Sequence, residues 1–219
     1  MKSQKSNVSR NSIILDYGRG SGAVLEMLKK IGYTNLQGVD VSSACIKACK
    51  KRGLKADLIK SEVINLGSKK YDLILLLDVL EHVENDKALL RKLKSSLREN
   101  GQMLITVPAH QFLWRPHDEV NQHHRRYLRK KLRNLIVSSN LKVIYLRWCD
   151  STLFFAFFIS SIYSKIKKVL TTNSLYSTNE FTIPPTHISK MLFKVLSFES
   201  KSKMMGKLIG VSVVAYIKR

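Results

Sequence analysis

The sequence predicts a doubly wound α/β domain built on a mostly parallel sheet. Three observations lead to this prediction: short apolar runs alternate with segments of helical periodicity, the first run ends in a glycine-rich turn, and one run is apolar almost throughout. This alternation is typical of parallel sheets with helices on both faces. The chain has 219 residues, of which 44% are hydrophobic, which suffices for one such domain and excludes a disordered basic chain.

Seven segments have the composition of strands. Ser12–Asp16 is an apolar run that ends at a turn, and Tyr71–Leu77 is the most apolar run, as expected for a strand buried on both faces at the sheet centre. The other five predicted strands are Leu36–Val39, Ala56–Ile59, Gln102–Val107, Leu141–Leu146 and Ile209–Ile217. The first two of these flank a helix, and Ala56–Ile59 has only a weak strand composition. Helical spacing and capping residues predict helices over Ser21–Ile31, Ser42–Lys51, Val83–Leu97 and Arg129–Ser138, with a turn over Glu99–Gly101.

We predict a single domain over residues 1–219. Segment 151–207 does not follow the alternation of strands and helices, and we interpret it as a helical insertion before the last strand. It opens with the apolar run Thr152–Tyr163, followed at once by Lys165, Lys167 and Lys168. The run is shorter than the roughly 20 residues that span a bilayer. An interfacial helix on an anionic membrane surface, a wall for a lipid-like substrate, a dimer contact and a buried helix at the sheet edge all remain open.

The chain is strongly basic, with a formal net charge of +22, and most of the excess lies in residues 120–219, where the acidic residues are Asp150, Glu180 and Glu199. Such a surface attracts nucleic acid, anionic lipid headgroups or acidic substrates. The three cysteines provide neither a disulfide framework nor a zinc site, and the amino terminus is too polar for a secretory signal. We therefore expect a cytoplasmic protein, with the inner face of the membrane as one place where it could bind.

The turn after the first strand contains Gly18 and Gly20, and glycines there let the backbone approach a ligand at a helix amino terminus. Gly18, Gly20 and Ala23 also have the spacing of the dinucleotide-binding pattern, in which Asp40 would be the ribose ligand. Asp16, at the end of the first strand, would repel a pyrophosphate and attract an ammonium group. S-adenosylmethionine carries an ammonium and a sulfonium cation, so Asp16 favours this cofactor over a nicotinamide dinucleotide.

Four segments in order carry a family resemblance: ILDYGRGSG at 14–22, GVDVS at 38–42, YDLILLLDVLEHV at 71–83 and LRENGQMLITVPA at 97–109. With these motifs the chain resembles class I S-adenosylmethionine-dependent methyltransferases, and most of all the small-molecule group that includes enzymes of the ubiquinone-biosynthesis type. The resemblance implies a Rossmann-like seven-stranded sheet whose last strand is antiparallel. It also implies S-adenosylmethionine as the cofactor.

The same resemblance implies which residues hold the cofactor. In that family the first motif holds the methionine part, the acid after the second strand binds ribose, and the DVLEH segment closes over the cofactor. The matching positions are Asp16, Gly18, Gly20, Asp40, Asp78, Val79 and His82. A residue after the third strand usually binds adenine, and Glu62 or Asp57 is the candidate. Arg19 stands where a small residue or Cys is usual, and only a short segment precedes the first strand, where family members often place a helix over the pocket.

The stretch after the fifth strand is rich in histidine and resembles a subgroup of these methyltransferases. The subgroup pattern is P-A-x-x-x-L-W-x-x-H-D, a short spacer, then H-x-R-R-Y, and His123 rather than His124 takes its position. Arg115 and Gln122 depart from that pattern. A histidine with a pKa near neutrality suits removal of a proton from an attacking oxygen or nitrogen, and a neighbouring carboxylate can orient it. The candidate catalytic residues are His123, Asp118 and His117.

Arginines in the same stretch could hold a carboxylate or phosphate of the substrate. The candidate substrate-binding residues are Trp114, Arg125, Arg126 and Tyr127. The alternative to a substrate-binding role is a structural one, in which Arg125 and Arg126 are a solvated helix start and His82 and His110 are hydrogen-bonded core residues. The histidines lack the partners of a structural zinc site, so we expect no metal.

The sequence thus favours a methyltransferase that uses S-adenosylmethionine and acts on a small or lipid-linked acceptor. The net charge keeps an RNA methyltransferase open, although no base-methylation motif and no RNA-binding module is visible. A non-catalytic, membrane-associated protein that retains the fold is a second alternative. A nicotinamide dehydrogenase is a third, disfavoured by Asp16.

Overall fold

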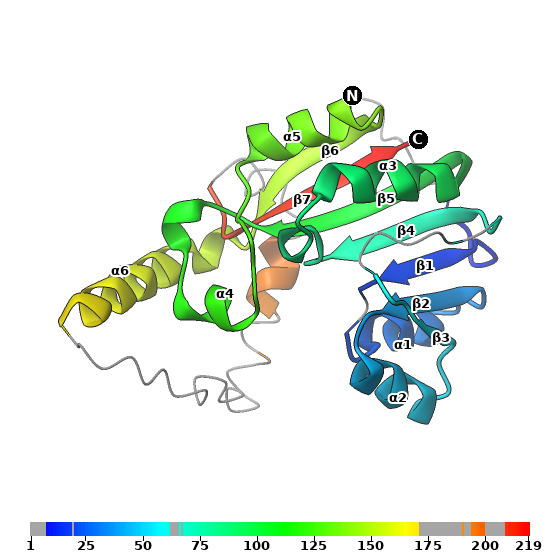
Figure 1. Ribbon diagram of the computed structural model, residues 1–219, viewed down its shortest axis with the longest axis horizontal. Helices are drawn as coiled ribbons and strands as arrows, with labels where there is room; N and C mark the ends of the chain where they lie inside the picture. Colours follow the sequence, from blue (N-terminus) through cyan, green and yellow to red (C-terminus); the bar gives the residue numbers. More distant parts are fainter. Residues whose placement is uncertain are drawn as a thin grey trace.

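A computed structural model of the chain describes residues 8–18, 20–61, 66, 68–170, 190, 194–199 and 209–219. Its centre is a seven-stranded sheet in the order β3-β2-β1-β4-β5-β7-β6 (Figure 1). The strands are β1 (Ile14–Tyr17), β2 (Leu36–Asp40), β3 (Ala56–Leu58), β4 (Tyr71–Leu77), β5 (Leu97–Pro108), β6 (Lys142–Cys149) and β7 (Ser212–Lys218).

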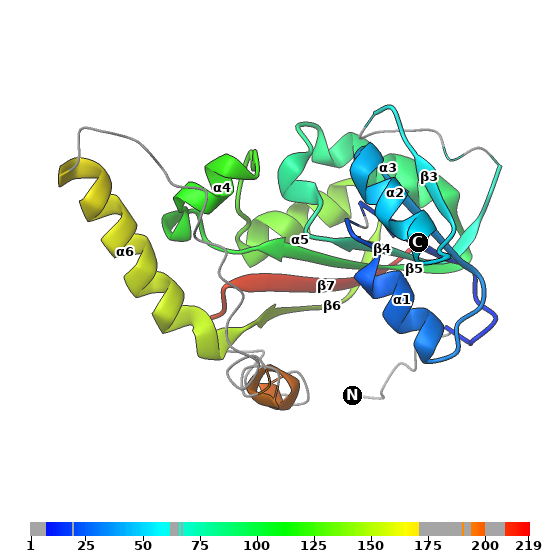
Figure 2. The ribbon, with the colours of Figure 1, turned by 90° about the horizontal axis from the view of Figure 1, so that it is seen from below.

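Helices connect these strands in the predicted alternation. They are α1 (Ala23–Lys30), α2 (Ser43–Lys51), α3 (Asp86–Ser96), α4 (Pro116–Val120), α5 (Arg129–Ser138) and α6 (Phe154–Leu170), with 3₁₀ turns at Leu80–His82, Gln111–Leu113 and Ser151–Leu153. Figure 2 shows α3 and α5 on one side of the sheet and α1 on the other. The two faces are therefore both covered, as in a doubly wound domain.

Strand directions confirm the predicted fold class. Strands β1 to β5 pair in parallel, and β7 runs antiparallel to both of its neighbours, β5 and β6. The central strand β4 buries Tyr71, Ile74, Leu75 and Leu76, as its apolar composition predicts. In Figure 1 the parallel strands point toward the side on which α4 and α6 lie, so their carboxyl ends face these two helices.

Several predicted boundaries differ from the structure by a few residues, and two of the differences have a clear local cause. The predicted turn Glu99–Gly101 lies inside β5, because Tyr71 pairs with Leu97 and Leu73 with Gln102, so the residues between bulge out of the ladder without ending the strand. The helix predicted from Val83 starts at Asp86, where the Asn85 side chain accepts a hydrogen bond from the N–H of Ala88 and caps it. Local capping and pairing decide both boundaries.

Helix α6 is the first part of the predicted insertion. Its base packs in a small apolar cluster of Leu113, Phe154 and Val211, and the helix then extends away from the sheet (Figure 2). Phe155 is 72% exposed and Ile159 is 66% exposed, which excludes the alternative of a helix buried at the sheet edge. No helix among the described residues is both long and apolar enough to cross a membrane. The side chains of Lys165, Lys167 and Lys168, and most of residues 171–207, lie outside the described residues.

Candidate active site

A cavity of about 360 Å³ lies at the carboxyl edge of the parallel strands, where open α/β sheets bind ligands. Residues that follow β1, β2, β3 and β4 form its wall. They are Tyr17, Gly18, Gly20, Asp40, Val41, Ile59, Asp78, Val79, His82 and Val83. The structure thus brings together most of the residues that the resemblance assigns to the cofactor, and we refer to this space as the first cavity.

The glycine turn places bare backbone against this cavity. Gly18 has a φ of 71°, which favours glycine, and a Cβ there would lie 2.6 Å from Cγ2 of Val79. A Cβ on Gly20 would meet nothing within 4 Å, so the backbone there borders open space. A side chain at Gly18 would collide with Val79, so glycine is needed for this turn to pack against the segment after β4.

Asp40 ends β2 with its carboxylate fixed by two backbone donors. The N–H of Gly20 donates to Oδ2 at 2.9 Å and the N–H of Ser42 donates to Oδ1 at 2.8 Å. Each oxygen keeps further acceptor capacity on the cavity side. A rigid carboxylate of this kind fits the two hydroxyls of a ribose, so the residues present fit S-adenosylmethionine.

Asp78 ends β4 in a strained conformation, with a φ of 53° that is uncommon for a residue other than glycine. Its N–H donates to the carbonyl and to the hydroxyl of Thr106, and that hydroxyl lies 3.1 Å from Asp78 Oδ1. Asp150, with a φ of 59°, lines the neighbouring cavity together with Asp78. Strained residues of this kind concentrate at functional sites.

Two predicted cofactor residues do not line the first cavity, and a third falls outside the described residues. Asp16 is 1% exposed and does not line the first cavity. Asp57 accepts a hydrogen bond from Gln37 Nε2 at 2.7 Å and lines a different cavity. Glu62 and Arg19 lie outside the described residues. Ile59, which the sequence analysis did not select, follows β3 directly and takes part in the wall.

A second cavity, of about 610 Å³, shares Asp78 and His82 with the first. Its lining includes the polar residues Glu81, Arg115, His117, Asn121, His123, Arg126 and Asp150. It also includes the apolar residues Pro108, Leu153, Phe157, Leu196 and Val211. The histidine-rich segment therefore faces the cofactor region, as its position after the fifth strand predicts.

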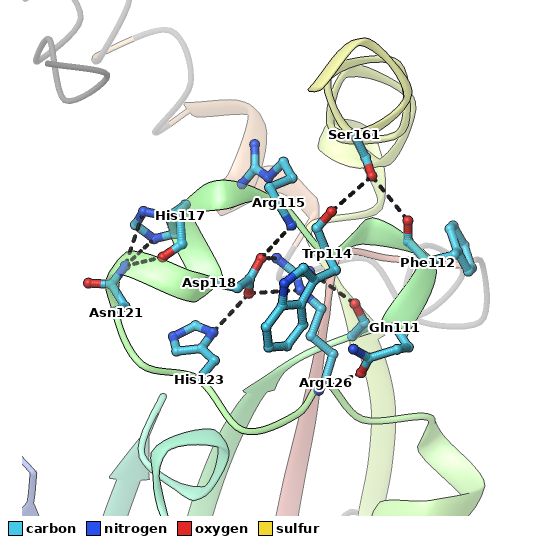
Figure 3. Close-up of polar contacts among 11 residues, drawn as sticks. Gln111, Phe112, Trp114, Arg115, His117, Asp118, Asn121, His123, Arg126 and Ser161 are labelled. Atoms are coloured by element: carbon cyan, nitrogen blue, oxygen red, sulfur yellow. Dashed lines mark hydrogen bonds and ion pairs between the residues drawn. The ribbon is translucent and has the colours of Figure 1, made fainter. Parts of the chain in front are cut away.

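Asp118 organises the polar side of the second cavity (Figure 3). Its Oδ1 accepts from His123 Nδ1 at 2.8 Å and from Arg126 Nε at 2.9 Å, while Oδ2 accepts from Arg126 Nη2 and from the N–H of Arg115, each at 2.9 Å. Burial alone would raise the pKa of this carboxyl, but the hydrogen bonds from His123 and Arg126 outweigh it and hold the pKa well below its usual range. Asp118 is thus ionised and can only accept hydrogen bonds. The Nδ1 of His123 is therefore the donor to Asp118, and Nε2 takes no part in this hydrogen bond.

Glu81 belongs to the DVLEH segment that the resemblance assigns to the cofactor, but it was not selected as an acceptor-side residue. Its side chain is buried in the wall of the second cavity, and neither carboxyl oxygen has a hydrogen-bond partner among the described residues. Burial, with the nearby charge of Asp78, raises the pKa of Glu81 to about 8. The adjacent His82 has a lowered pKa, first because it is buried and then because His123 lies near.

The remaining predicted substrate residues are held by internal contacts. Arg125 pairs with Asp86 and with the carbonyl of Glu84, and the Tyr127 hydroxyl donates to Asp86 at 2.8 Å. Burial raises the pKa of Tyr127, so it stays a neutral donor. Of the four candidates only Arg126 lines the second cavity, and Asp118 already engages its guanidinium. His117 lines the same cavity, against the side-chain amide of Asn121.

The sequence matches the methyltransferase domain family over residues 5–146. The ubiquinone biosynthesis O-methyltransferase of Rickettsia felis is 32% identical over 99 residues, which cover 43% of this chain and 40% of that protein. The enzyme of the same name from Pelagibacter ubique is 31% identical over 103 residues, 45% of this chain and 42% of that protein. The matched stretch thus spans less than half of these relatives.

Solved structures with low sequence identity share the fold. An S-adenosylmethionine-dependent methyltransferase from Archaeoglobus fulgidus has a TM-score of 0.58 at 14% identity, covering 95% of this chain and 86% of that one. One from Mesorhizobium loti has a TM-score of 0.60 at 13% identity, covering 95% and 91%. The family match covers most of the chain and agrees with this fold and with the glycine turn and Asp40. The chain therefore belongs to the class I S-adenosylmethionine-dependent methyltransferases.

Proposed function

We propose that this protein transfers a methyl group from S-adenosylmethionine to a hydroxyl oxygen of a small acceptor with an apolar, lipid-like portion. One observation carries the proposal: the cofactor cavity and the second cavity share Asp78 and His82 as a wall. A methyl donor in the first cavity and an acceptor in the second would meet at this wall. The mixed polar and apolar lining of the second cavity fits a polar reacting group joined to an apolar portion.

The bound cofactor supplies an activated methyl group on a sulfonium, so the protein contributes chiefly proximity and orientation. Asp40 would hold the ribose and the backbone at Gly18 and Gly20 would border the methionine part. On the acceptor side, His123 would take the hydroxyl proton at Nε2. Asp118 is a positioning residue, because it acts on the acceptor only through His123. His117 stays a candidate in the same wall.

The apolar portion of the acceptor would lie against Leu153, Phe157 and Val211. This apolar wall continues into α6, whose exposed face carries Phe155, Ile159 and Tyr163. An exposed apolar helix on a chain with a net charge of +22 suits an anionic membrane surface. The names of the curated relatives, O-methyltransferases of ubiquinone biosynthesis, favour oxygen as the acceptor atom. We therefore propose a lipid-linked acceptor, met at the membrane surface by a protein of the cytoplasm.

The experiment supplies purified protein with S-adenosylmethionine labelled in its methyl group, together with a bacterial lipid extract or, separately, with total RNA. The proposal expects label in the organic phase that survives alkaline hydrolysis, because methyl ethers resist base and methyl esters do not. The variant Asp40→Ala should lose this transfer, whereas Asp57→Ala, in the unrelated cavity, should keep it. Label in RNA, or in alkali-labile esters, would contradict the proposal.

A further inference from the structure

A group of three ligating side chains lies where the two cavities meet. One carboxylate oxygen of Glu81 and one ring nitrogen each of His82 and His123 lie within 4.8 Å of one another. We propose that Glu81, His82 and His123 bind a divalent transition-metal ion such as Zn²⁺, contrary to the absence of a metal expected from the sequence. Binding itself stands on these residues alone, whereas its use in catalysis rests on the proposed function.

Glu81 provides the first argument. The residue is 1% exposed, and its two carboxyl oxygens have no hydrogen-bond partner among the described residues. Burying a carboxylate without a partner costs several kcal/mol in general, so such groups take up a proton, pair with another group or bind a metal. The charge of Arg126 favours an ionised Glu81, but its guanidinium is already hydrogen-bonded to Asp118. A cation beside Glu81 would supply the missing partner.

His123 provides the second argument. Metal-binding histidines generally donate their other ring N–H to a carboxylate, which fixes the tautomer and orients the ring. His123 Nδ1 lies 2.8 Å from Asp118 Oδ1, and three further donor atoms hold that carboxylate in place. The His82 and His123 rings stand at 87° with their centroids 4.6 Å apart. The ring nitrogen that Asp118 leaves available is therefore Nε2, the ligand atom that the site requires.

The backbone fixes the two segments that carry the ligands. Glu81 and His82 lie in the 3₁₀ turn after Asp78, closed by a hydrogen bond from the N–H of His82 to the carbonyl of Val79 at 3.0 Å. The N–H of His124 donates to the carbonyl of Glu81 at 2.7 Å and joins the second segment to the first. Two imidazoles and one carboxylate suit Zn²⁺ and its first-row neighbours and leave at least one position open.

An open position at this wall gives the ion a role in the transfer. The acceptor hydroxyl would bind there, and the ion would lower its pKa so that its proton leaves to water. The oxygen lone pair then forms the new C–O bond with the methyl carbon, while the C–S bond of the donor breaks with its electron pair retained by sulfur. In this arrangement His123 is a ligand, and no proton acceptor on the protein is needed.

The test is metal binding by the purified chain, stripped with a chelator, dialysed and titrated with Zn²⁺ in a calorimeter or with Co²⁺ followed by its visible absorption. We expect one equivalent to bind. Glu81→Gln and His123→Ala should each weaken binding by more than about 100-fold, and Asp118→Asn by roughly 10- to 100-fold, as for other outer-shell carboxylates. His124→Ala is the matched control, because that exposed imidazole lies in the same loop but outside the cluster. Thermal melting of each stripped variant separates lost ligation from lost folding.

Absence of binding to the folded wild-type chain overturns the metal site, as does equal binding by Glu81→Gln and His123→Ala. If methyl transfer then proceeds in the presence of chelator, the proposed function survives with His123 as the proton acceptor. Stoichiometric binding that depends on Glu81 and His123 supports the site even if no acceptor is methylated. The metal site and the proposed function therefore fail separately.

Discussion

The two halves of the site are built in different ways. On the cofactor side, short motifs at strand ends present backbone groups and one rigid carboxylate, Asp40, that a neighbouring turn holds in place. On the acceptor side, ionisable side chains of the segment after β5 gather around buried Asp118, and contacts of His124 with Glu81 and of His123 with His82 join this segment to the turn after β4. The difference teaches that backbone geometry at strand ends determines the cofactor half, whereas a side-chain network and its contact with a second segment determine the acceptor half.

The largest expected effect concerns turnover. His123→Ala should lower kcat by roughly 100- to 10,000-fold, the usual contribution of a group that assists proton removal. Binding of S-adenosylmethionine should stay unchanged, because His123 does not line the first cavity. Steady-state kinetics and calorimetry with the cofactor measure the two quantities, and His124→Ala serves as the control. A comparable loss of cofactor affinity would abolish the distinction between the two halves.

The next effect concerns stability. Arg126→Met removes the partner of fully buried Asp118 and leaves its charge uncompensated, so the free energy of unfolding should fall by about 3 to 5 kcal/mol. The half-exposed pair of Arg125 with Asp86 should contribute at most about 1 kcal/mol, as measured in Arg125→Met. Urea denaturation followed by circular dichroism measures both. Equal losses would mean that Asp118 does not organise the acceptor side.

A smaller effect is expected on cofactor affinity. Asp40→Ala removes two charge-assisted hydrogen bonds to ribose, each worth about 1.5 kcal/mol or more, and should weaken binding of S-adenosylmethionine by at least roughly 100-fold. Asp40→Asn keeps the shape of the side chain, so it distinguishes the effect of the lost charge from that of a loosened glycine turn. Asp57→Ala is the control for removing a carboxylate from the neighbouring strand. Unchanged affinity in Asp40→Ala would remove the cofactor assignment of the first cavity.

The smallest effect concerns α6. Replacing either Phe155 or Ile159 alone by Ser should reduce binding to anionic vesicles by about 1.5 to 3 kcal/mol, the free energy of moving one such side chain into an apolar layer. Stability should not change, because both side chains are exposed. Val137→Ser, at an exposed apolar position on α5, is the control. Sedimentation with vesicles measures binding, and an undiminished signal would argue against a membrane role for this helix.

Much of the cofactor half could be predicted because its signals are local. Gly18, Gly20 and Asp40 follow strands that an apolar run identifies, and parallel strands bring their carboxyl ends to one edge. Asp16 is 1% exposed and is not among the residues that line the first cavity, so its contact with the methionine part of the cofactor stays a prediction. Ile59 was missed because the third strand is short and its composition is weak.

On the acceptor side the sequence identified the right segment without its internal arrangement. Asp118, His123 and Arg126 were all selected, but their hydrogen bonds show that Asp118 occupies the guanidinium expected to meet a substrate. Glu81 was visible within the DVLEH motif, yet its relation to His123 depends on two segments far apart in the chain. No spacing rule connects them, because the contact is created by the turn after Asp78 and by the bond between His124 and Glu81.

The sequence by itself determined the order of strands and helices, the direction of the parallel strands and the cofactor class, because apolar periodicity and turn chemistry act over a few residues. Only the tertiary structure decided which charges are paired inside the protein and which are left for a ligand. That outcome depends on burial and on distances between atoms of separate segments, which set the cost of an uncompensated charge. The apolar run of α6 was evident from composition, but the position of this helix beyond the carboxyl edge of the sheet came from the fold.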